Sequence, residues 1–134
     1  MPLTPVRFCA RIAALALCLL IAGPALAQAG WKLVTSDSKG SYYIDQASTV
    51  IQGDMRNATS RTDYVGDGIQ KGVVRRVYEE NYDCRKRAVR LRKVTLYAAD
   101  DSVLASFDWA EGEIDWIAAA PESLGGLKIA AVCG

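Results

Sequence analysis

The side chains that could support catalysis in this chain are carboxylates, because the 134-residue sequence contains no histidine. This removes the most common general base, histidine-activated nucleophiles and most zinc sites. Paired carboxylates could still act as general acid and base. The candidates lie near predicted turns and exposed strand ends, and they are Glu79-Glu80, Asp100-Asp101, Glu111, Glu113 and Asp115. We interpret them as surface charges and predict a protein that is not an enzyme and uses no metal or cofactor.

A run of cations in the second half of the chain is the most unusual feature of the sequence. One hypothesis is a basic surface for an acidic partner, either a polyanionic glycan or a protein. The candidate binding residues are then Arg85, Arg87, Arg90, Arg92 and Lys93. The alternative is a solvated strand face whose charges discourage edge-to-edge pairing. Acidic residues just before the run offset its charge, which favours the alternative; they are Glu79, Glu80 and Asp83.

The N-terminus has the three zones of a secretory signal peptide. Arg7 and Arg11 precede an apolar run from Ile12 to Ile21, and an Ala-Leu-Ala cleavage site ends at Ala27. A membrane-spanning helix needs about 20 apolar residues, so this run is too short for one. A lipidated Cys18 is the other alternative, but the bulky Leu17 before it argues against lipidation. We predict a cleaved signal peptide over 1–27 and an exported single domain over 28–134 that carries no lipid anchor.

Cleavage leaves only two of the four cysteines, Cys84 and Cys133. An even number of cysteines in an oxidising compartment predicts a disulfide, and two buried free thiols are the alternative. Loss of Arg7 and Arg11 also lowers the Lys+Arg count from 16 to 14, against 15 Asp+Glu. A net charge near −1 gives no support for a nucleic-acid partner.

Short segments with β-branched and aromatic residues, separated by turn signals, predict antiparallel strands. The apolar positions change phase between Leu91 and Val94, which predicts a β-bulge near Arg92-Lys93. The predicted strands cover 31–35, 41–45, 55–65, 72–82, 89–97 and 103–109, with a short element at 48–51.

The C-terminal segment has apolar residues at helical spacing, so it predicts one helix. Pro121 and Glu122 suit its first turn, whereas Gly125 and Gly126 would each destabilise it by about 1 kcal/mol relative to alanine. Such a helix must be held by packing and by Cys133. The predicted fold class is therefore α+β, with an antiparallel sheet of about six strands and a C-terminal helix that a disulfide tethers to it.

Several short motifs in a fixed order resemble the surface-adhesin protein E family of bacterial envelope proteins. The motifs extend over nearly all of the chain after the signal peptide, and they are Trp31-Lys32, Tyr43-Ile44-Asp45, Ser48, Tyr82-Asp83-Cys84 with Arg85, Arg87 and Arg90, Tyr97, Trp116-Ile117, Pro121-Glu122-Ser123 and Ala131-Val132-Cys133. The resemblance implies a bent sheet with a tethered C-terminal helix. It also implies binding of host matrix or serum proteins such as laminin, vitronectin or plasminogen.

Two departures from the family pattern limit what the resemblance implies for function. The best-known member resembles a lipoprotein anchored at the outer membrane, whereas the leader of this chain lacks a usable lipidation site. In addition, Pro121-Glu122-Ser123 stands where the family pattern has Pro-Gly-Ser. Two hypotheses follow. One is a secreted or periplasmic, non-enzymatic binding module of the protein E type, with a host matrix or serum protein as its expected partner. The other is a periplasmic structural or accessory protein with a bacterial partner and no host ligand. The sequence leaves a homodimer open in either case.

Overall fold

The computed structural model describes residues 30–134. The predicted signal peptide, with Cys9 and Cys18, lies outside the described residues. No helix in the described part of the chain has the length and apolar composition needed to cross a membrane.

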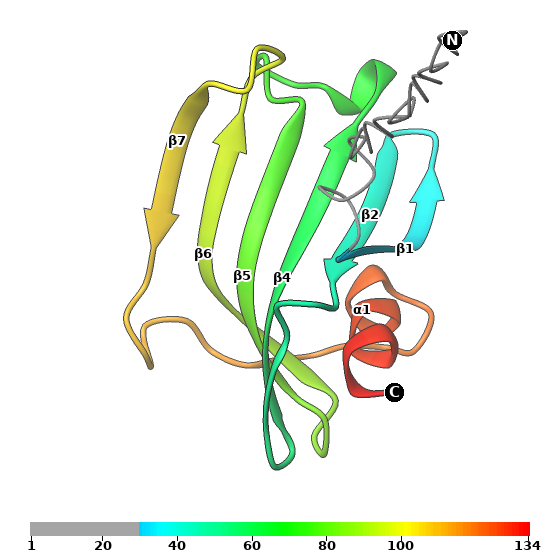
Figure 1. Cartoon of the computed structure of the whole chain (residues 1–134), viewed down its shortest axis with the longest axis vertical. Coiled ribbons are helices and arrows are strands. Elements are labelled where there is room, and N and C mark those ends of the chain that lie inside the picture. Colours follow the sequence, from blue (N-terminus) through cyan, green and yellow to red (C-terminus); the bar gives the residue numbers. More distant parts are fainter. Residues whose placement is uncertain (1–29) are drawn as a thin grey trace, which may run out of the picture.

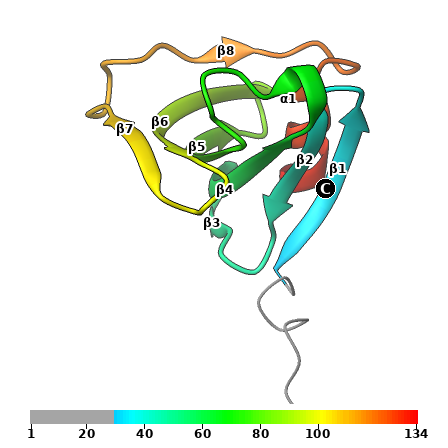
Figure 2. The same ribbon diagram turned by 90° about the horizontal axis from the view of Figure 1, so that it is seen from above.

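The sheet consists of antiparallel neighbours in the order β1-β2-β4-β5-β6-β7, and it curls around one helix, α1 (Leu124–Cys133) (Figure 1, Figure 2). Two short strands pair outside this order, β3 with β4 and β8 with β6. We call the face that packs against α1 the inner face and the opposite one the outer face. The strands are β1 (Trp31–Asp37), β2 (Gly40–Asp45), β3 (Val50–Gln52), β4 (Met55–Tyr64), β5 (Arg75–Asp83), β6 (Ala88–Tyr97), β7 (Val103–Asp108) and β8 (Ile117–Ala118).

This architecture confirms the predicted fold class, and the predicted bulge is also present. Glu79 pairs with Lys93 while Glu80 pairs with Leu91, so Arg92 is the extra residue of β6. The bulge explains the change of phase, because one inserted residue shifts the alternation of inward and outward side chains.

Several predicted strand boundaries differ from the observed ones by one to three residues, and one short strand was not predicted. The first predicted strand, 31–35, is longer, because β1 continues to Asp37. The strand predicted from residue 72 begins at Arg75, because Lys71 and Gly72 adopt positive φ angles of 50° and 75° in a turn. The two-residue β8, within a segment without periodicity, was not predicted.

The core lies between α1 and the inner face of β2, β4 and β5. Ile44, Tyr82 and Ile129 are fully buried, and Ala58 is 5% exposed. Strand alternation sends every second side chain inward, so Tyr78, Glu80 and Tyr82 of β5 share the inner face with Ser60 of β4.

The helix begins later than the sequence indicated. The Ser123 side chain accepts a hydrogen bond from the Gly126 backbone N–H at 3.1 Å and caps the first turn. Pro121 and Glu122 therefore precede the helix. Gly126 is needed for packing, because a Cβ there would lie 2.0 Å from the Ala120 carbonyl oxygen. The glycine lowers helix propensity and permits a close approach of the chain.

Glu80 forms a buried ion pair with Lys128, which contradicts its assignment to the exposed charges. Its Oε1 lies 2.5 Å from Lys128 Nζ, and its Oε2 accepts hydrogen bonds from Ser60 Oγ (2.8 Å) and Tyr82 OH (2.5 Å). Burial raises the pKa of Tyr82, so its hydroxyl stays protonated and donates to Glu80. Because both carboxylate oxygens have partners, the charge is tolerated inside the molecule.

The predicted disulfide is confirmed and joins Cys84, at the end of β5, to Cys133, in the last turn of α1. The two cysteines are 49 residues apart in sequence. In the loop-entropy model, closing a loop of this size raises the free energy of unfolding by about 4 kcal/mol. Together with the Lys128–Glu80 pair, the bond fixes α1 at two points along its length.

We expect reduction of the disulfide to lower the free energy of unfolding by about 4 kcal/mol, because the unfolded chain gains freedom. Urea unfolding followed by circular dichroism, with and without reductant, measures this change. The Cys84→Ala/Cys133→Ala double variant is the control: its unfolding midpoint should be low and insensitive to reductant. Equal midpoints for the oxidised and reduced wild type would contradict the tethered-helix interpretation.

Candidate functional site

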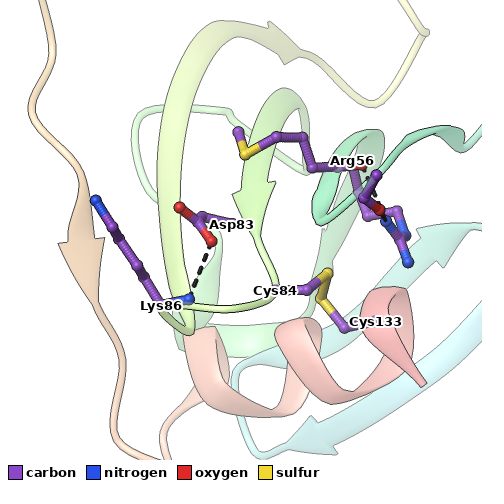
Figure 3. Close-up of a disulfide and its surroundings, with 7 residues drawn as sticks. Arg56, Asp83, Cys84, Lys86 and Cys133 are labelled. Carbon is purple, nitrogen blue, oxygen red and sulfur yellow. Dashed lines mark hydrogen bonds between the residues drawn. A yellow bond between two sulfur atoms is a disulfide. The ribbon is translucent and has the colours of Figure 1, made fainter.

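The β5–β6 turn carries three consecutive exposed cations, Arg85, Lys86 and Arg87, directly after the disulfide. Asp83 Oδ1 accepts a hydrogen bond from the Lys86 backbone N–H at 3.0 Å, and Arg87 has a φ of 51° (Figure 3). The side-chain acceptor and the left-handed residue together make a tight turn. The turn therefore projects its cations into solvent from a defined backbone.

The β3–β4 turn lies beside this basic turn. The Cys84 backbone N–H donates to the Asp54 carbonyl at 2.9 Å, and Arg56 Nη1 donates to the Gly53 carbonyl at 2.6 Å. Figure 1 shows the two hairpins reaching the same end of the sheet, near the C-terminus of α1. We call residues 50–56, residues 83–87 and the helix end 131–133 the tip.

The tip combines positive charge with exposed apolar side chains. Its four cations and two carboxylates give a net charge of +2; they are Arg56, Arg85, Lys86 and Arg87, and Asp54 and Asp83. Val50 is 50% exposed and Ile51 is 65% exposed. A hollow of about 160 Å³ separates Ile51 from Ala131 and Val132 of α1. This end of the molecule can therefore offer both charge and apolar area to a partner.

Arg90 lies away from the tip and is 9% exposed. Its guanidinium carbon lies 4.5 Å from the ring centroid of Trp116, and its Nη2 donates to Asn81 Oδ1 at 3.1 Å. It also forms an ion pair at 3.4 Å with the exposed Glu111. Stacking on Trp116 removes Arg90 from solvent, so its side chain attaches the segment after β7 to the outer face of β6.

Arg92 and Lys93 occupy the outer face farther along β6. Arg92 Nη1 donates to Asn81 Oδ1 at 3.3 Å, and its Nε donates to the Trp109 carbonyl at 3.2 Å. Arg92 also borders a hollow of about 320 Å³. Lys93 lies between its cross-strand partners Glu79 and Asp108, so an acidic residue flanks it on each side in the sheet.

The structure thus divides the five predicted binding residues into two groups. Arg85 and Arg87 belong to the exposed tip, whereas Arg90, Arg92 and Lys93 lie on the outer face among partners within the chain. The burial of Arg90 had no signal in the sequence, because Trp116 follows it by 26 positions in a segment without periodicity. Within residues 30–134, no cluster of three potential metal-ligating Cys, Asp or Glu side chains is present.

Comparison with protein families places these features in a known group. The model of the family described as surface-adhesin protein E matches residues 31–134. The chain belongs to this family. The match confirms the resemblance, since it includes both cysteines, the basic turn and α1.

Solved structures of protein E from Haemophilus influenzae have a similar fold. Crystal form II is 14% identical, with a TM-score of 0.54, and the alignment covers 78% of this chain and 87% of that one. The selenomethionine form is 11% identical, with a TM-score of 0.55 and coverage of 78% and 86%. At this identity the likeness establishes the fold alone. A search of curated proteins found no match.

We expect Arg90 and Arg85 to respond differently to substitution by alanine. Arg90→Ala removes the stacking on Trp116 and a hydrogen bond to Asn81, so it should lower the free energy of unfolding by about 1–3 kcal/mol. Arg85→Ala changes an exposed turn residue and should leave stability nearly unchanged. Urea unfolding of both variants measures the difference. Equal stabilities would show that Arg90 has no structural role.

Proposed function

We propose that this protein is an exported, non-enzymatic adhesin that binds a protein partner through the tip. The observation that carries the proposal is the juxtaposition, at one end of the sheet, of three exposed cations with exposed Val50 and Ile51. Membership of the surface-adhesin protein E family supports it.

The composition of the tip suits a protein partner with an acidic surface. Arginine is enriched in protein interfaces, and exposed apolar side chains supply area that can be buried on binding. Cations at the rim of an interface accelerate encounter with an acidic partner. Because the basic turn and the apolar residues lie on adjacent hairpins, one partner surface can contact both.

The covalent structure behind the tip favours binding by a preformed surface. The disulfide joins the base of the basic turn to α1, and the Cys84–Asp54 backbone hydrogen bond joins it to the neighbouring turn. A surface that is ordered before binding loses less conformational entropy when the complex forms. We therefore assign the disulfide a second role, in which it holds the two turns of the tip in register.

The partner we propose is a host extracellular-matrix or serum protein, because the family is described as a surface adhesin and such proteins are what a surface adhesin would meet outside the cell. Laminin, vitronectin and plasminogen are the ligands to test. An envelope partner from the bacterium itself is the second candidate, and the predicted absence of a lipid anchor favours it. The two candidates differ in where the protein must be located.

Charge reversal at the tip should weaken binding. We expect the Arg85→Glu/Lys86→Glu variant to bind immobilised laminin, vitronectin or plasminogen about tenfold more weakly at low salt, mainly through slower association. The control, Lys32→Glu/Lys71→Glu, changes the net charge equally at exposed positions outside the tip. Biolayer interferometry over a salt series measures both. If the control weakens binding as much as the tip variant, the tip is not the binding surface.

Location on the cell decides between host and bacterial partners. We expect protease treatment of intact cells to cleave the protein, or the protein to be found in the medium, because an adhesin must reach host molecules. Immunoblots of shaved cells and of periplasmic, membrane and medium fractions test this, with a known periplasmic protein as control. A protein that is protected and released only with the periplasm would favour the envelope partner.

A further inference from the structure

An open cavity of about 390 Å³ lies beside the first turn of α1, bordered by inner-face side chains of the sheet. This volume falls within the usual range for small-molecule sites. Its lining includes Tyr42, Thr62, Tyr64, Tyr78 and Lys128. A smaller hollow of about 130 Å³ adjoins it, because Tyr42 and Tyr64 line both, and this hollow adds Arg76. None of these residues belongs to the tip.

The uncharged part of the lining is aromatic and hydroxylated. Three tyrosine rings offer flat apolar surface, and hydroxyl groups offer hydrogen-bond donors and acceptors. The Tyr78 hydroxyl, like that of any tyrosine, is protonated at neutral pH and can donate, and burial raises its pKa further, to about 12. Thr62, at 5% exposure, forms part of the floor. A ligand with both hydroxyl groups and an aliphatic ring face matches this lining.

Among the charged side chains of the lining, Arg76 and the exposed Lys39 form no salt bridge within residues 30–134. Lys128 pairs with Glu80, and Arg61, another lining residue, pairs with Asp63, which Arg75 shares. In the described part of the chain, Arg76 forms no salt bridge, and its buried Nε has no hydrogen-bond partner. Its guanidinium carbon lies 5.5 Å from the ring centroid of Tyr64.

The buried Nε of Arg56, Arg61 and Arg90 also has no partner, but each of those guanidiniums binds a carbonyl or carboxylate oxygen through another nitrogen. Arg76 has no such partner within residues 30–134, and buried polar groups nearly always have one. A carboxylate or sulfate group accepts hydrogen bonds from arginine in a planar, two-bond arrangement. Tyr64 holds the guanidinium at the boundary of the two hollows. An anionic group bound at Arg76 would therefore extend from a ligand body lying against the tyrosine rings.

We propose that the two adjoining hollows on the inner face form a binding site for an acidic saccharide, whose anionic group binds Arg76 and whose sugar ring lies against Tyr42, Tyr64 and Tyr78. The site is separate from the tip, so this inference does not depend on the protein-binding function proposed above.

Glucuronic acid, glucose and acetate are the probes that separate the contributions to binding. Glucuronic acid and glucose differ by the oxidation of one carbon, and acetate supplies the carboxylate without the sugar ring. Nuclear magnetic resonance titration of the ¹⁵N-labelled protein reports both affinity and location. We expect saturable shifts for glucuronic acid at Tyr42, Tyr64, Tyr78 and Arg76, with glucose and acetate each binding at least about tenfold more weakly.

Neighbouring arginines of β5 provide the matched variants. Arg76→Met should weaken binding of glucuronic acid about tenfold. Arg75→Met should not, because Arg75 pairs with Asp63 and Asp101 and does not line the hollows. The tip variant Arg85→Glu/Lys86→Glu should also bind glucuronic acid normally.

Three outcomes would overturn the proposal. They are the absence of saturable shifts in the wild type, shifts confined to residues away from these hollows, and equal affinity for acetate and glucuronic acid. All three are measured on the wild-type protein, so they hold even if Arg76→Met fails to fold.

Discussion

The attachment of α1 to the inner face of the sheet is the interaction on which the rest of this structure depends. An isolated helix of ten residues containing two glycines is unstable in water. The disulfide at its C-terminal end, the Lys128–Glu80 pair and the burial of Ile129 hold it against the sheet. Without α1, Ile44 and Tyr82 would face solvent on a curved sheet that has no other α-helix in residues 30–134 to cover it.

The Lys128–Glu80 pair adds specificity to this attachment more than stability. Desolvation of two charges opposes the Coulomb attraction between them, so a buried pair contributes little net free energy. Its geometry, however, admits one position of the helix, because Ser60 and Tyr82 already fix the Glu80 carboxylate. A shift of α1 by one turn would separate Lys128 from Glu80 and leave each charge without its ionic partner. Apolar packing alone, with small side chains along much of the helix, would tolerate such a shift more readily.

Local patterns in the sequence predicted those features of the structure that depend on residues close together in the chain. The alternation of apolar and polar residues predicted the main strands, and its change of phase after Leu91 predicted the bulge at Arg92. The even number of cysteines left after signal-peptide cleavage predicted the disulfide. The burial of Glu80 was open to prediction as well, because alternation with Tyr78 and Tyr82 places it on the apolar side of β5. The burial of Arg90 under Trp116 was not, because it depends on the path of an irregular segment. The basic run therefore looked continuous in sequence although the fold divides it.

Strand alternation also places neighbouring cations of β5 on opposite faces of the sheet. Arg75 and Arg76 are adjacent on β5, yet one pairs with carboxylates outside the two hollows and the other faces the tyrosines of the inner face. The tip depends on Cys84 directly, whereas the inner hollows depend on the position of α1, which Cys133 secures. Both surfaces therefore require the same covalent bond. Because such bonds persist in oxidising compartments, a reduced cytoplasmic form would lose the covalent support of both proposed surfaces.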